Sequence, residues 1–130
     1  MSKKSDREWK EVLPDDVYQI TRKAQTEAPF SGKFNGHKAS GSYVCACCKR
    51  PLFRSNEKYE SGSGWPSFWQ PVDDQAVVNH EDDTHGMRRI EVTCKDCDAH
   101  LGHVFDDGPN PTGQRYCINS LALEFVATDD

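Results

Sequence analysis

The chain has 130 residues, about the length of one domain, and only 35% of them are hydrophobic, a low fraction for a domain held together by burial alone. Its formal net charge of −5 argues against a protein that binds nucleic acid or an anionic membrane through a basic surface. No apolar stretch approaches the length of a membrane span, and the first residues lack the apolar region of a secretion signal. We therefore expect one domain over residues 1–130, located in the cytoplasm, with neither nucleic acid nor membrane as a partner.

Two short helices are predicted at the N-terminus. Ser5 is a suitable N-cap for the first helix, and Pro14 begins the second, with two acidic residues in its first turn. Their apolar faces are formed by Trp9, Val12 and Leu13 in the first helix and by Val17, Ile20 and Ala24 in the second. Because each helix is too short to be stable in isolation, we expect both to pack on the rest of the domain.

Frequent glycine and proline residues divide the chain after residue 28 into short pieces, as is typical of strands and turns. The clearest strand spans 87–94, where apolar residues alternate with polar ones: Ile90, Val92 and Cys94 against Arg89, Glu91 and Thr93. The alternation returns near the C-terminus, at Leu121, Leu123 and Phe125. Long loops are expected at 60–66 and 106–114, and a frayed tail at 128–130. The sequence therefore predicts an antiparallel β core with helices at the N-terminus.

Two CxxC pairs, far apart in the chain, have the spacing of metal ligands: Cys45 with Cys48, and Cys94 with Cys97. Two such turns complete a four-thiolate zinc site, which would hold two distant hairpins together and leave no open position for chemistry. The alternatives are a pair of disulfides or redox-active CxxC motifs. The lack of a secretion signal disfavours the first, and the lack of a thioredoxin-like pattern disfavours the second. Cys47 lies inside the first pair, and the spacing selects Cys48 as the ligand.

Cys117 lies outside both pairs. If 115–119 is a strand, Arg115, Cys117 and Asn119 share one face, and a thiol beside a guanidinium and an amide donor is typical of an activated nucleophile. The alternative is that Cys117 is a small buried apolar residue of the core.

Two other motifs carry residues suited to chemistry at this thiol. His100 and His103 follow the second CxxC pair directly, so either could act as a general acid near neutral pH; alternatively they are metal ligands or surface residues. Trp65 and Trp69 lie in a segment framed by glycine and proline, where an aromatic wall could receive a small apolar group. For Trp69 we expect a core position instead.

The motifs GWPSFWQP at 64–71 and HGMRRIEVTCKDCDAHLGHVFDDGPNPTGQRYCINS at 85–120, together with the CxxC pairs, closely resemble the B-type methionine sulfoxide reductases, which act on the R epimer of methionine sulfoxide. The resemblance covers about residues 8–126 and rests on several long motifs. It implies a mainly β fold of two small antiparallel sheets, with short N-terminal helices and a structural zinc ion on the four paired cysteines.

The resemblance also implies roles for single residues. Cys117 matches the nucleophile; His103, His100 and Asn119 match the residues that line the sulfoxide site; Trp65 matches the residue that holds the substrate's methyl group; and Arg115 matches the arginine before the nucleophile. We expect the Cys117 thiolate to attack the sulfoxide sulfur while His103 donates a proton, leaving a cysteine sulfenic acid. The expected partners are proteins or peptides with methionine-R-sulfoxide and thioredoxin or another thiol reductant, and the expected state is a monomer.

The chain departs from the family pattern at Ser63, where many members carry the cysteine that resolves the sulfenic acid. Three explanations stay open. An external thiol reduces Cys117 directly, Cys47 takes over the resolving role, or Ser63 is an engineered replacement.

Two other classes of protein share some of these features. A non-enzymatic zinc module would explain the CxxC pairs, but the acidic charge opposes nucleic acid as its ligand. A redox sensor or thiol peroxidase would use Cys117 without needing Trp65. Neither class accounts for both the HLGH motif and the GWPSF motif, and turnover on the R sulfoxide, the S sulfoxide and peroxide separates the three.

Overall fold

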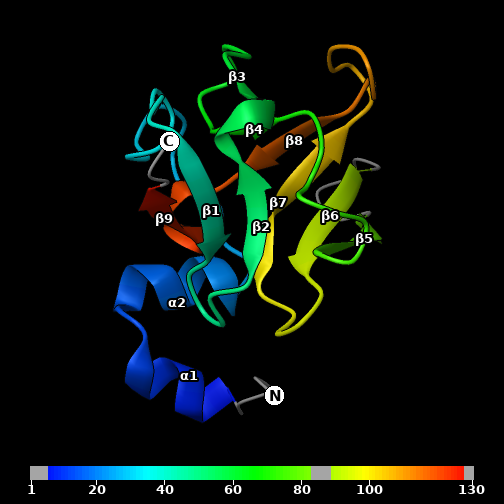
Figure 1. The fold of residues 1–130 in the computed structure, drawn as a ribbon. Coiled ribbons are helices and arrows are strands. Elements are labelled where there is room, and N and C mark those ends of the chain that lie inside the picture. Colours follow the sequence, from blue (N-terminus) through cyan, green and yellow to red (C-terminus); the bar gives the residue numbers. More distant parts are fainter. Residues whose placement is uncertain (1–5, 83–88, 128–130) are drawn as a thin grey trace.

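The computed structural model describes residues 6–82 and 89–127 (Figure 1). Two helices are followed by strands, with short 3-10 helices at Ser55–Glu57 and Ser120–Ala122. The helices are α1 (Asp6–Val12) and α2 (Asp15–Thr21), and the strands are β1 (Gly41–Cys45), β2 (Pro51–Arg54), β3 (Lys58–Tyr59), β4 (Ser67–Phe68), β5 (Val77–Asp82), β6 (Arg89–Cys94), β7 (His100–Phe105), β8 (Arg115–Ile118) and β9 (Leu123–Ala127).

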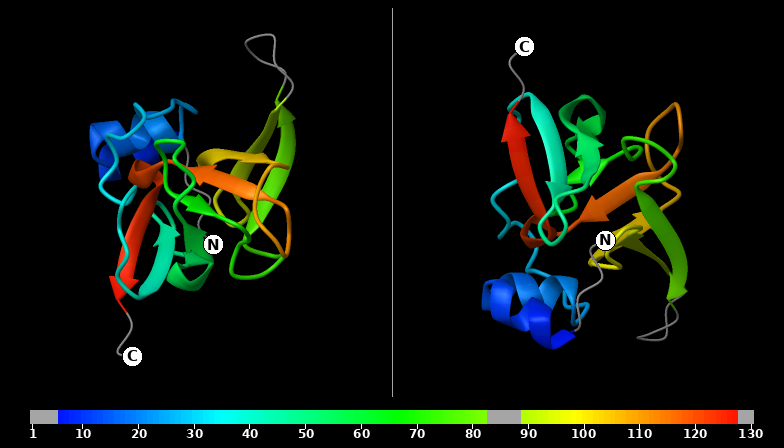
Figure 2. Two further views of the ribbon diagram at one scale, coloured as in Figure 1. Left: turned by 90° about the horizontal axis from the view of Figure 1, so that it is seen from above. Right: turned by 60° about the horizontal axis from the view of Figure 1, so that its bottom comes forward.

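The strands form two antiparallel sheets, which confirms the predicted fold class. One sheet has three strands in the order β2-β1-β9, and the other has six in the order β3-β4-β8-β7-β6-β5. The helices lie together at one end of the molecule, below the strands in Figure 1 and again in the right-hand view of Figure 2. Within the described residues, no helix is both long enough and apolar enough to cross a membrane.

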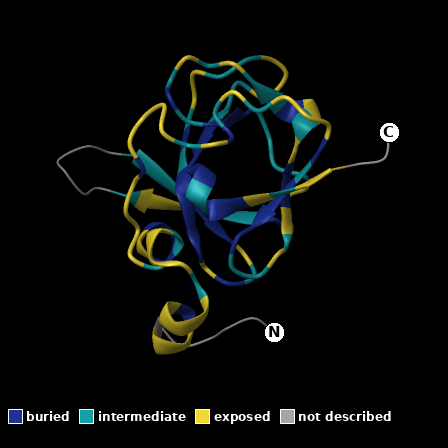
Figure 3. Ribbon diagram, turned by 90° about the vertical axis from the view of Figure 1, so that its left-hand side faces the viewer, coloured by how far each residue is buried: buried dark blue, intermediate teal, exposed yellow. Residues whose placement is uncertain are grey.

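Aromatic rings join the two sheets. Phe53 on β2 stacks on Phe68 on β4 with 4.5 Å between ring centroids, and Tyr43 on β1 meets the same ring edge-on at 5.2 Å. All three side chains are fully buried, and the burial of Tyr43 raises the pKa of its hydroxyl to about 12. Buried residues accordingly occupy the middle of the molecule in Figure 3. Rings of this size supply much apolar area per residue, which suits a chain with a low apolar fraction.

The N-terminal helices occur where the sequence predicts them, but their faces differ in detail. Trp9 in α1 and Ile20 in α2 are buried as expected, whereas Val12 is exposed. Ala24 was expected on the face of α2, and this was wrong: the helix ends at Thr21, and Ala24 is exposed with a positive φ of 57°. The predicted cap residue, Ser5, lies outside the described residues.

The β region follows the predicted pattern with three corrections. Strand β6 and the loops at 60–66 and 106–114 are where they were expected, although the start of the predicted strand at Met87 and the tail at 128–130 lie outside the described residues. Burial does not follow the alternation at the end of β6, because Thr93 is buried together with Val92 and Cys94. Leu121 belongs to a 3-10 turn and not to the last strand, and Trp69 is half-buried rather than in the core.

Candidate active site

Strands β7 and β8 bring the predicted nucleophile and the predicted acid together. In their antiparallel register His103 stands directly opposite Cys117. Residues directly opposite each other in such a pair project to the same face of the sheet. The two strands also approach closely at the neighbouring position, because a Cβ atom added to Gly102 would lie 2.0 Å from the backbone oxygen of Cys117.

A pocket of about 260 Å³ opens at this position. Its lining includes all of the predicted site residues except His100, whose ring lies 5.6 Å from that of His103. The lining residues are Thr26, Trp65, Arg89, Gly102, His103, Phe105, Arg115, Cys117 and Asn119. The fold thus gathers into one pocket residues that span more than half of the chain.

Arg115 holds a positive charge against the sulfur of Cys117. Its Nη1 lies 2.9 Å from Sγ, while Nε and Nη2 donate to the carboxylate of Asp107 at 2.8 and 3.1 Å. The hydrogen bond with Asp107 raises the pKa of Arg115 further, and Arg115 in turn lowers the pKa of Asp107. A charge-assisted hydrogen bond to sulfur favours the thiolate, the nucleophilic form of cysteine.

Each histidine of the pair is oriented by a carboxylate. Nε2 of His103 lies 2.9 Å from Oδ2 of Asp82, and Nδ1 of His100 lies 2.7 Å from Oε2 of Glu91. Burial lowers the pKa of His103, although Asp82 acts in the opposite direction. The imidazole of His103 is therefore neutral at pH 7, so it can accept a proton from a thiol and pass it on.

Backbone hydrogen bonds around residue 27 fix both Trp65 and Asn119. Trp65 Nε1 donates to the carbonyl oxygen of Glu27 at 3.0 Å, and the amide of Glu27 donates to Oδ1 of Asn119 at 3.1 Å. Nδ2 of Asn119 donates to the carbonyl oxygen of Leu101 at 3.0 Å. The buried amide group of Asn119 therefore ties the segment that holds the indole to strand β7.

Four carboxylates that hold this site were not predicted from the sequence: Glu27, Asp82, Glu91 and Asp107. One of them, Glu91, could have been recognised from the pattern of its strand. Glu91 belongs to the polar face of the strand predicted at 87–94, and it stands opposite His103 in the register of β6 with β7. That face of the strand points to the site.

Ser63 is in contact with the predicted nucleophile, because its Oγ lies 3.5 Å from Sγ of Cys117. Ser61 donates to Ser63 at 2.9 Å and lies 2.6 Å from the hydroxyl of Ser67, which is 3.9 Å from the same sulfur. Two hydroxyl groups, those of Ser63 and Ser67, thus contact the thiol, and the hydroxyl of Ser61 links them.

The four paired cysteines meet where β1 and β6 end, and the cluster contains Cys48 rather than Cys47. Their sulfur atoms all lie within 4.8 Å of one another. Two of the distances are 3.6 Å, from Cys45 to Cys97 and from Cys48 to Cys94, close to the spacing of about 3.8 Å for tetrahedral thiolates around zinc. The cluster can therefore bind a metal ion.

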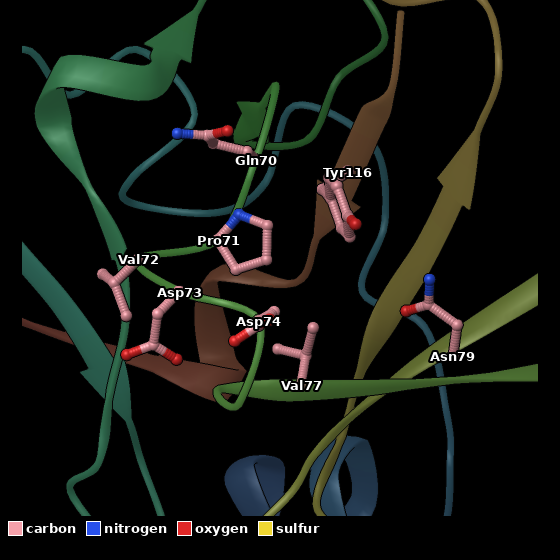
Figure 4. Close-up of a pocket in the computed structure, with 8 residues that line it drawn as sticks. All are labelled: Gln70, Pro71, Val72, Asp73, Asp74, Val77, Asn79 and Tyr116. Carbon is pink, nitrogen blue, oxygen red and sulfur yellow. The ribbon is translucent and has the colours of Figure 1, made fainter. Parts of the chain in front are cut away.

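A separate pocket of about 400 Å³ lies on the other side of β8, where Tyr116 faces the segment before β5 (Figure 4). It carries the carboxylates of Asp73 and Asp74. Among the described residues that line it there is no thiol and no imidazole, so the chemistry predicted for Cys117 has no second location there.

Comparisons with known proteins point to one family. The model of the SelR domain matches residues 13–127. The chain is 55% identical over 127 residues to a peptide methionine sulfoxide reductase MsrB of Hahella chejuensis, with 98% of this chain and 91% of the relative covered. It is 55% identical to the protein of the same name from Pseudomonas putida, covering 97% and 95%, and 56% identical to that from Thioalkalivibrio sulfidiphilus, covering 95% and 90%.

Proposed function

The chain belongs to the SelR-domain family of B-type peptide methionine sulfoxide reductases, and we propose that it reduces the R epimer of peptide-bound methionine sulfoxide at Cys117. The observation that carries this proposal is the arrangement of Arg115, Cys117 and His103 around one pocket. It combines a thiol beside a fixed positive charge with a neutral imidazole on the same face of the sheet.

The proposed first step transfers oxygen from the substrate to the enzyme. His103 takes the proton of the Cys117 thiol, and Arg115 stabilises the resulting thiolate, which attacks the sulfoxide sulfur. His103 then returns the proton to the sulfoxide oxygen, because this oxygen is a poor leaving group until it is protonated. The S–O bond of the substrate breaks, methionine leaves, and Cys117 becomes a sulfenic acid.

Trp65, Asn119 and His100 account for substrate orientation in this proposal. The indole of Trp65 takes the methyl group on one side of the pocket, while His100 and Asn119 orient the oxygen, or water around it, on the other side. Only one epimer places its methyl group on the ring and its oxygen on these donors at the same time. Nε2 of His100 supports such a role, because it is buried and has no hydrogen-bond partner among the described residues.

The second half of the proposed cycle uses an external thiol, thioredoxin or another reductant, which returns Cys117 from the sulfenic acid to the thiol. Ser63, one of the residues in contact with Sγ, has a hydroxyl group, which cannot form a disulfide. The six unbridged cysteines suit a reducing compartment, and we propose a monomer that acts in the cytoplasm.

We propose that the ion held by Cys45, Cys48, Cys94 and Cys97 is zinc in a structural role. Four thiolates would fill every coordination position of a zinc ion, so the ion would supply stability and no reactive position. The residues of this cluster lie outside the lining of the Cys117 pocket.

A single-turnover assay tests the proposed nucleophile. Without added reductant, the wild-type chain converts peptide-bound methionine-R-sulfoxide in a stoichiometric burst, and Cys117→Ser lowers the rate of that burst by about a thousandfold or more. Cys47→Ser is the matched control and keeps the burst. A burst that survives in Cys117→Ser contradicts the proposal, and faster turnover of peroxide than of the R sulfoxide assigns the chain to the thiol peroxidases instead.

A further inference from the structure

A second pocket is lined by Ser63 and Arg115, both of which contact the sulfur of Cys117. It has a volume of about 540 Å³ and lies between the 59–63 segment and the 107–109 segment. Arg115 lines both this pocket and the substrate pocket, whereas Ser63 lines only this one. Because Oγ of Ser63 is 3.5 Å from Sγ, a small group at the inner end of the second pocket is within reach of the nucleophile.

The direction of attack on a sulfenic acid decides which pocket a reductant can use. Displacement at sulfur proceeds in line, so the incoming thiolate and the departing oxygen occupy opposite sides of the sulfur. In the proposed cycle the oxygen of the sulfenic acid comes from the substrate and therefore points into the substrate pocket, toward His103. Ser63 contacts Sγ but does not line the substrate pocket, so we assign the opposite side of the sulfur to Ser63.

We propose, on the basis of the proposed function, that the thiol that recycles Cys117 enters through this second pocket, which we call the reductant pocket. The thiolate attacks Sγ, a new S–S bond forms, and the S–O bond breaks as the hydroxyl group takes the thiol's proton and leaves as water. A second thiol attacks the mixed disulfide and releases Cys117 as a thiol together with the oxidised disulfide of the reductant. Two thiols supply the two electrons that reduce the sulfenic acid.

The chemistry of the reductant pocket fits a thiol. The guanidinium of Arg115, which lines the pocket and contacts Sγ, favours an approaching thiolate, and the hydroxyl groups of Ser61 and Ser63 can donate hydrogen bonds to that thiolate. At its edge Glu60 carries an exposed carboxylate, 3.8 Å from Lys38. The pocket is large enough for a low-molecular-weight thiol, and a cysteine on a protein loop can reach it in the same chemistry.

Filling the inner end of the reductant pocket tests the route. Ser63→Val adds two methyl groups beside Sγ, and Ser63→Ala removes the same hydroxyl without adding bulk. After a single-turnover burst, we expect the valine variant to be reduced at least about tenfold more slowly than the alanine variant. Equal rates of reduction in the two variants overturn the proposal. The burst itself reports on the proposed function, so failure of that function is seen separately.

Two reductants distinguish the sources of the thiol. Slower reduction of Ser63→Val by 2-mercaptoethanol alone assigns the pocket to small thiols, and slower reduction by thioredoxin alone assigns it to a protein thiol. Slower reduction by both assigns it to both, and slower reduction by neither overturns the proposal.

A change of charge at the edge of the pocket gives an independent test that leaves Ser63 intact. Glu60→Lys reverses the charge at the edge of the pocket and removes the partner of Lys38. The control is Glu124→Lys on β9, which makes the same charge change and removes the partner of Lys49. We expect Glu60→Lys to raise the ratio of the reduction rates by 3-mercaptopropionate and by cysteamine about fivefold at low ionic strength, with the burst unchanged. An unchanged ratio, or an equal change in Glu124→Lys, counts against the route.

Discussion

Arg115 has one contact in the site that the sequence predicts and one that it does not predict. Its contact with Cys117 follows from the alternation of a strand, since residues two apart share a face. Its second contact, with Asp107, depends on how the loop before β8 folds back, and no local pattern in the sequence reports that. The same holds for Asp82 and Glu91. The histidines that these carboxylates orient were predicted as site residues, but the carboxylates themselves were not.

Glu27 is a buried residue that binds parts of the site through both its side chain and its backbone. Its side chain is only 7% exposed, and Oε1 accepts a hydrogen bond from the amide of Leu121 at 3.0 Å. Its own backbone binds Trp65 and Asn119. The side chain therefore anchors the segment on which the indole depends.

Two substitutions at Glu27 separate the effect of its hydrogen bond to Leu121 from the effect of its negative charge. Glu27→Ala leaves the Leu121 amide without its acceptor, which costs about 1–3 kcal/mol, and we expect KM for the sulfoxide to rise because Trp65 loses its fixed position. Glu27→Gln keeps an oxygen acceptor and is expected to stay near wild type. Steady-state kinetics together with indole fluorescence measure both effects, and an unchanged KM in the alanine variant would show that the segment needs no anchor.

At the scale of elements, the strands with a clear period were predictable and the shortest were not. β6 and the two long loops follow from alternation and from glycine and proline. β3 and β4 have two residues each, too few to show any period, and they exist because β8 supplies a neighbour. Both helices were predicted, but the end of α2 was not, because Ala24 favours a helix by propensity and the fold ends it earlier.

The close approach of β7 to β8 yields a test of how the site is positioned. Gly102→Ala places a methyl group against the backbone of Cys117, so the strands must separate. We expect a loss of about 1–3 kcal/mol in the free energy of unfolding and a lower burst rate. Gly36→Ala is the control, with open space around the added methyl group and an expected change within about 0.5 kcal/mol. Urea unfolding measures both, and equal stability of the two variants contradicts the steric argument.

For the whole molecule, the cysteine cluster connects parts that otherwise meet through aromatic packing. Cys45 ends β1 in the small sheet, and Cys94 ends β6 in the large one. Arg22, after α2, donates to the carbonyl oxygen of Cys97 at 2.7 Å, so the helices join at the same point. The CxxC spacing predicts that the four cysteines join distant parts of the chain. It does not predict which strands and helices they join.

Removal of the metal is expected to loosen all three parts at once. Cys48→Ser, or treatment with a strong chelator, is expected to remove bound zinc and about 3 kcal/mol or more of stability, which lowers Tm by roughly 10 °C. Cys47→Ser keeps both the zinc and the Tm. Metal analysis and thermal unfolding check this, and a Cys48→Ser variant that retains a full equivalent of zinc refutes the ligand assignment.

The pairing of β1 with β9 also orders events while the chain is being made. Gly41 pairs with Ala127, so the small sheet lacks a strand until β9 has left the ribosome. All four cysteines of the cluster precede Cys117 in the chain. A nascent chain therefore presents every ligand of the proposed metal site before it presents the proposed nucleophile.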